Sequence, residues 1–152
     1  MTTAATTATG STAAVDRFRL PGGVDAAATV QAAATMVRKQ TFTDQVELLL
    51  TTVGPRITAA GAGLSDARQL PAWRRGEEPR EEIRLERVAA LAEVATAVMA
   101  DYPASVAASF LRGSQPALDD HSPVLMIRGA SEKDLPKVMS EIRAAVRAFL
   151  QG

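Results

Sequence analysis

The shortage of aromatic residues is the strongest constraint on how this chain can fold. Hydrophobic residues make up 47% of its 152 positions, yet only 4% are Phe, Trp or Tyr. A core of this composition must be built from Ala, Val, Leu, Ile and Met, which favours closely packed helices over a β-sandwich with bulky strand residues. We therefore predict an all-α fold, arranged as one compact unit or two small ones.

The charge balance and the absence of cysteine narrow the classes of function. Seventeen basic residues match seventeen acidic ones, so a general electrostatic attraction to nucleic acid is not expected. The chain has no cysteine, which excludes disulfides, thiolate metal sites and a cysteine nucleophile. It also lacks a long apolar run and a basic leader segment, so we expect a cytoplasmic protein with no membrane partner.

Helix-breaking Gly and Pro residues, together with the helical periodicity of apolar residues, divide the chain into a tail and two helical domains. Residues 1–23 are rich in Thr, Ala and Gly and are expected to be disordered. Residues 24–78 are expected to form the first domain, with helices over 24–40, near 46–53, over 56–62 and over 66–75. Residues 79–152 are expected to form the second domain, which begins with a long helix over 81–100.

The long helix over residues 81–100 combines a broad apolar face with many small residues. Alanines at positions 89, 90, 92, 95 and 97 let another helix approach closely, so this helix is the expected contact in a homo-oligomer, most simply a homodimer. Beyond it, Pro103, Ser122 and Pro123 delimit short helices, and a final helix is expected to start near Ser131 or Asp134.

No arrangement of residues points to catalysis. Asp119, Asp120, His121 and Ser122 form a cluster that could be mistaken for a catalytic or metal site, but adjacent turn residues rarely converge and no second histidine exists. Ser122 is explained as a helix N-cap. The Gly61-x-Gly63 pair is half of a dinucleotide fingerprint without a preceding strand. We therefore expect no enzyme activity, no cofactor and no metal.

The last third of the chain carries an ordered series of short motifs: Phe110-Leu111, Gln115-Pro116, Leu118-Asp119, Ser122-Pro123 and Ile127-Arg128-Gly129. This order resembles the toxin-binding domain of Xre/MbcA/ParS-type antitoxins. The resemblance implies a cognate RES-type toxin, an NAD-consuming enzyme that is blocked when the carboxy-terminal end of the antitoxin covers its active site. It places toxin binding on Arg143, Arg147, Phe149, Leu150, Gln151 and Gly152. The alternative is that Phe149 and Leu150 only complete the core.

A second resemblance covers the segment before the long helix. Ile57-Thr58-Ala59-Ala60, Gly63-Leu64-Ser65 and Trp73-Arg74-Arg75-Gly76 resemble the Xre-like helix-turn-helix of the same antitoxins. The resemblance implies contact with operator DNA through Asp66, Arg68, Gln69, Arg74 and Arg75. Pro71 lies inside the presumed recognition helix, where a proline removes a hydrogen-bond donor and kinks or shortens a helix.

These patterns predict an antitoxin-like protein that binds and neutralises a RES-type toxin and, where the helix-turn-helix reads DNA, represses its own operon. Two alternatives stay open. The first is a stand-alone Xre-family transcriptional regulator, and the second is a helical adaptor that uses both domains for protein contacts without a toxin partner.

Overall fold

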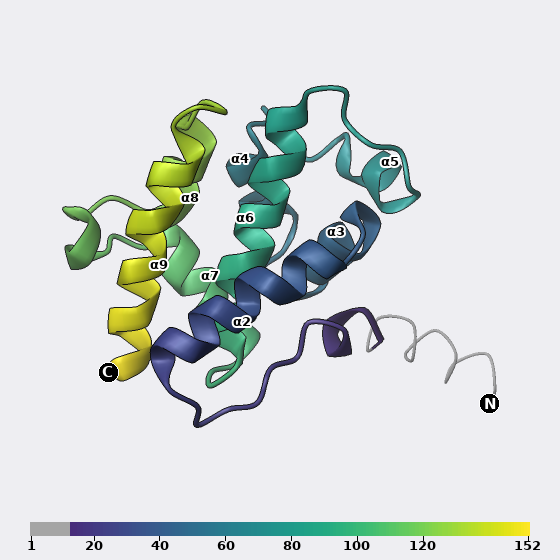
Figure 1. Ribbon diagram of the computed structural model, residues 1–152. Coiled ribbons are helices and arrows are strands. Elements are labelled where there is room, and N and C mark those ends of the chain that lie inside the picture. The colour runs from purple at the N-terminus through teal and green to yellow at the C-terminus, as the bar shows by residue number, and fades with distance from the viewer. Residues whose placement is uncertain (1–12) are drawn as a thin grey trace.

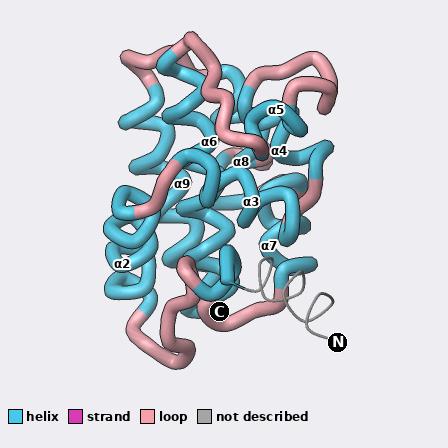
Figure 2. Tube along the Cα trace, turned by 90° about the vertical axis from the view of Figure 1, so that its right-hand side faces the viewer, coloured by secondary structure: helices cyan, strands magenta, loops and turns pink. Residues whose placement is uncertain are grey.

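The computed structural model describes residues 13–152, and in this part of the chain every regular element is a helix (Figure 2). The predicted all-α fold is confirmed. None of the helices in this described range is long and apolar enough to cross a membrane. The elements, in chain order, are α2 (Ala26–Lys39), α3 (Phe42–Thr52), α4 (Pro55–Ala62), α5 (Leu70–Arg74), α6 (Glu82–Met99), α7 (Ala104–Arg112), the 3₁₀ turn η1 (Pro116–Leu118), α8 (Pro123–Gly129) and α9 (Leu135–Gln151).

Local capping explains where several helices begin. The Asp25 carboxylate accepts a hydrogen bond from the N–H of Ala28 at 3.1 Å and starts α2. The Thr41 hydroxyl caps α3, so this helix begins before the cap predicted at residues 43 and 44. Ser122 caps α8 with Pro123 in its first turn, which confirms the prediction for this helix.

The long helix α6 lies at the centre of the fold, with other helices packed around it (Figure 1). From the first half of the chain α2, α3 and α4 pack on it, and from the second half α7, α8 and α9 do so. Its alanines at positions 90, 92, 95 and 97 are buried, which lets these neighbours approach closely. These four alanines therefore pack against helices of the same chain, and the homo-oligomer expected from the sequence stays a prediction.

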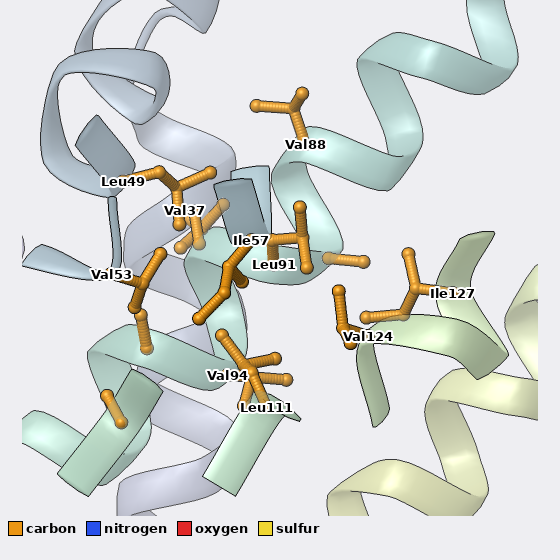
Figure 3. Close-up of a cluster of buried hydrophobic side chains, with 14 of the residues drawn as sticks. Val37, Leu49, Val53, Ile57, Val88, Leu91, Val94, Leu111, Val124 and Ile127 are labelled. Atoms are coloured by element: carbon orange, nitrogen blue, oxygen red, sulfur yellow. The ribbon is translucent and has the colours of Figure 1, made fainter. Parts of the chain in front are cut away.

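One continuous hydrophobic core runs through the described residues. Figure 3 shows part of it, with Ile57 from α4, Leu91 and Val94 from α6, Leu111 from α7 and Ile127 from α8. The boundary expected between residues 78 and 79 falls in the loop between α5 and α6, and the core continues across it. The two segments expected to be separate domains thus share one interior.

Residues 13–23, predicted to belong to a disordered tail, are packed against the helices. Residues 13–16 form a helical turn, and Phe18 is only 1% exposed. The N–H of Gly23 donates to the Asp101 carboxylate at 2.7 Å, and Arg17 pairs with Asp44 at 3.1 Å. The prediction of disorder is wrong for this stretch, because Phe18 provides an aromatic anchor within a Thr/Ala-rich composition. Residues 1–12 lie outside the described part of the chain.

Candidate functional site

A tight loop between α7 and α8 brings the motif residues of the last third together. The N–H of Gln115 donates to the carbonyl of His121 at 3.1 Å, and the carbonyl of Gln115 accepts from the N–H of Asp120 at 2.9 Å. Asp119 and Asp120 close the turn with φ angles of 53° and 65°, in the left-handed region that residues with a side chain seldom adopt. The Gln115 side chain also donates to the Phe110 carbonyl at 3.0 Å. These hydrogen bonds stabilise the turn in which both aspartates have positive φ angles.

Beside this loop the surface is hollowed over about 840 Å³. Leu125 of α8 lines the hollow and is 61% exposed, although the largest apolar side chains of the described residues are mostly buried. Arg112, Asp119, Asp120 and Glu141 also line it, and none of these four forms an ion pair within residues 13–152. The hollow thus combines one large exposed apolar side chain with charged groups around it, a mixture of an apolar centre and a polar rim that contact surfaces between proteins also have.

The same loop contains the cluster considered above as a catalytic or metal site. The Nδ1 atom of His121 lies 2.9 Å from the Leu118 carbonyl, so one ring nitrogen takes part in the turn itself. Within residues 13–152, no group of three His, Asp or Glu side chains is placed to hold a metal ion. The cluster closes the turn and, through Ser122, caps α8.

Two of the six residues predicted to bind a toxin hold α9 on the fold. Arg143 donates from Nη2 to the Glu93 carboxylate on α6 at 2.9 Å, and Glu93 is only 7% exposed. This hydrogen bond raises the pKa of Arg143, so its guanidinium remains charged. The ring of Phe149 packs against Tyr102 and Phe110, with centroid distances of 5.2 and 5.1 Å.

The other four predicted toxin-binding residues lie at the outer end of α9. Arg147, Gln151 and Gly152 are exposed, and Leu150 is half-buried. The alternative from the sequence is that Phe149 and Leu150 only complete the core. It agrees with the packing of Phe149 and, in part, with that of the half-buried Leu150. The structure does not bring the six residues together as one exposed surface.

Each arginine predicted to contact DNA has a carboxylate partner. The pairs are Arg68 with Asp66 at 2.7 Å, Arg74 with Glu47 at 2.7 Å and Arg75 with Glu77 at 3.4 Å. The hydrogen bond to Arg68 is the main cause of a lowered pKa at Asp66, so this carboxylate stays ionised beside the arginine. Gln69 is exposed. The pairing neutralises the basic patch and reduces its attraction for phosphate.

The helix predicted over residues 66–75 is much shorter in the structure, so this prediction is wrong in extent. Helix α5 spans Leu70–Arg74, with Pro71 in its first turn, where a missing N–H has no consequence. Before it, the Asp66 carboxylate accepts from the N–H of Arg68 at 2.9 Å, a local turn that competes with helix. Residues 63–69 therefore separate α4 from α5, where a helix-turn-helix has a turn of three or four residues.

Sequence reasoning did not single out Leu125. The sequence pattern predicts that Val124 and either Met126 or Ile127 face the core, and the structure buries Val124 and Ile127. The signal that could have identified Leu125 is its position between these two residues, because a large apolar side chain there falls off the buried face of a short helix.

Comparison of this chain with protein-family models, with curated proteins and with solved structures finds no match. Its fold and its hollow define a helical protein with a candidate partner-binding surface.

Proposed function

We propose that this protein is an antitoxin-like binding protein that neutralises a RES-type, NAD-consuming toxin by contact through its C-terminal helices. The observation that carries the proposal is the hollow around Leu125. The hollow is built from the segment whose motifs resemble the antitoxin toxin-binding domain. In this role the chain acts by occupying a surface of its partner and needs no catalytic group of its own.

Leu125 supplies the anchor of the proposed contact. Full burial of a leucine side chain contributes about 1.5–3 kcal/mol, and about 1.4 kcal/mol changes an affinity tenfold. Because Leu125 is 61% exposed, a large part of this free energy remains available to a partner. The unpaired charges of Arg112 and Glu141 at the same hollow would contribute mainly to the choice of partner and to the association rate.

The hollow supports the proposal better than the tip of α9 does. A plug must leave this protein and enter the partner, but Phe149 is held between two aromatic rings of its own chain. Arg147 and Gln151 are exposed and can extend the contact surface along α9. We therefore place the main contact on α7, the loop after it and α8.

The ion pairs of the three arginines and the short α5 do not favour repression of the operon by DNA contact, so our proposal does not include it. Exposed ion pairs are weak, so exchanging the partners of Arg68, Arg74 and Arg75 for phosphates would cost little. However, the carboxylate partners neutralise the positive charge of these arginines, so this part of the surface gives little long-range attraction to DNA. A short α5 also gives few positions from which side chains could reach base edges.

The test is co-expression with a candidate RES-type toxin, read out as growth rescue and as the affinity of the purified complex. We expect Leu125→Asp to weaken binding about tenfold or more, because it replaces the apolar anchor by a charge that must be desolvated. Thermal unfolding should stay close to that of the unmodified chain, since Leu125 is exposed.

The matched control is Val24→Asp, because Val24 is also a large exposed apolar residue, at 41%, and does not line the hollow. This variant should bind and rescue normally. Normal rescue by a folded Leu125→Asp variant would show that the hollow is not the contact surface. Absence of binding by the unmodified chain to every RES-type candidate would contradict the antitoxin proposal itself.

A further inference from the structure

Two arginines from the second half of the chain bind the C-terminal end of α4 and the turn after it. Arg128 of α8 donates from Nη1 to the carbonyls of Ala60 at 2.8 Å and Leu64 at 2.9 Å. Arg87 of α6 donates to the carbonyl of Ala62 at 3.4 Å and to that of Ala130 at 2.9 Å. The partners of both arginines are thus neutral carbonyl groups.

No carboxylate compensates these two charges. Neither Arg87 nor Arg128 forms an ion pair within residues 13–152. Burial, followed by the nearby charges of Arg84 and Arg128, lowers the pKa of Arg87. The end of α4 is therefore a place where positive charge accumulates in a chain whose formal net charge is zero.

A hollow of about 520 Å³ opens at this place, between α4, the loop after it and α8. Arg56 and Arg128 both line it, and Arg56 is exposed and also without an ion-pair partner in the described residues. Ser65 lines it too and brings a hydroxyl group. Asp66 is the one acidic residue of the lining, and its carboxylate is bonded to Arg68.

The loop at this hollow also has spare backbone donors. The N–H groups of residues 65, 66 and 67 form no hydrogen bond with any group in the described part of the chain. Arg128 uses Nη1 for the Ala60 and Leu64 carbonyls, while its Nε and Nη2 groups form no hydrogen bond in the described residues. Together with the Arg56 guanidinium, the Ser65 hydroxyl and the free N–H groups, they form a donor set that suits an anion with several acceptor oxygens.

We propose that this hollow is a phosphate-binding site, in which Arg56 and Arg128 hold the phosphate oxygens and Ser65 donates a further hydrogen bond. The phosphate is either a free phosphate group or a phosphodiester of a nucleic-acid backbone, because both present the same oxygens. The site goes beyond the proposed toxin binding and lies apart from the hollow around Leu125, with which it shares no lining residue.

The first test is a titration of the full chain with inorganic phosphate at constant ionic strength, followed through the backbone amide signals of residues 64–67. Arg56→Gln should weaken binding about tenfold, because it removes a charged donor that no other group replaces. Arg80→Gln is the matched control, since Arg80 is exposed, has no ion pair in residues 13–152 and does not line the hollow. Asp66→Asn should strengthen binding, because it removes the one negative charge of the lining.

The second test uses a short random duplex DNA and distinguishes the two sources of phosphate. Weaker duplex binding by Arg56→Gln, together with competition by inorganic phosphate, would assign the site to a nucleic-acid backbone. Binding of inorganic phosphate alone would assign it to a free phosphate group. Equal responses of Arg56→Gln and the unmodified chain, or no response to either probe, would overturn the proposal. Leu125→Asp should bind phosphate normally, so failure of the toxin proposal and failure of this one can be told apart.

Discussion

At the scale of single residues, Gly61 lies where the backbone of α4 meets a side chain of α6. A Cβ atom built on Gly61 would stand 2.6 Å from both terminal carbons of Leu91, which is itself fully buried. The role of Gly61 is therefore close packing of α4 against α6.

Gly61→Ala is expected to destabilise the fold. Overpacking of a core costs about 1–3 kcal/mol, whereas the gain in helix propensity from glycine to alanine is at most about 1 kcal/mol. The matched control is Gly129→Ala at the end of α8, where a Cβ meets nothing within 4 Å, so that variant should be neutral or slightly stabilised. Urea unfolding followed by circular dichroism measures both. A Gly61→Ala variant as stable as the control would mean that Leu91 moves aside without cost.

At the scale of elements, α9 shows how one helix serves both the fold and its surface. Its apolar stripe is buried through Leu135, Met139, Ile142 and Val146, as the periodicity predicts. The half-buried Phe149 extends this stripe by its contacts with Tyr102 and Phe110. The last two residues are exposed and contribute no such packing.

Two truncations separate these roles of α9. Deletion of residues 149–152 should lower the free energy of unfolding by about 1–3 kcal/mol, because it removes an aromatic side chain with two ring partners. Deletion of residues 151–152 should leave stability unchanged, and it should preserve neutralisation if the Leu125 hollow is the main contact. Thermal unfolding and growth rescue with the same toxin measure the two effects. Loss of rescue by the shorter deletion, with a normal melt, would move the contact to the tip of α9.

At the scale of the whole molecule, α6 makes the chain one structural unit. It contributes apolar side chains to contacts with helices from both halves, and the core cluster includes residues from Phe18 to Val146. Because α6 belongs to the second half, α2, α3 and α4 of the first half bury apolar side chains against the second half. We therefore expect residues 24–78 and 79–152 to unfold together.

This cooperativity can be measured because the chain has a single tryptophan. Trp73 is buried and packs on Phe42, so its fluorescence reports on α3 and α5, whereas far-ultraviolet circular dichroism reports on all helices. The two signals should give the same midpoint and slope in urea. An earlier fluorescence transition, with most of the helical signal intact, would restore the division into two domains.

The sequence by itself determined the features that depend on neighbours within one helical turn. The aliphatic composition implied helices, Ser122 and Pro123 marked the start of α8, and the spacing of apolar residues identified the buried stripe of α9. These signals are local, because capping bonds and helical faces join residues at most a few positions apart.

Only the tertiary structure decided how distant residues compensate one another. Arg74 forms an ion pair with Glu47 on another helix, and Arg143 pairs with Glu93, fifty positions away in the sequence. Neither arginine is therefore an unpaired charge. Phe18 is buried by helices that follow it, while Leu125 remains exposed because no other part of residues 13–152 covers it. The candidate sites depend on which charges and apolar faces remain without partners, and that is a property of the packed chain.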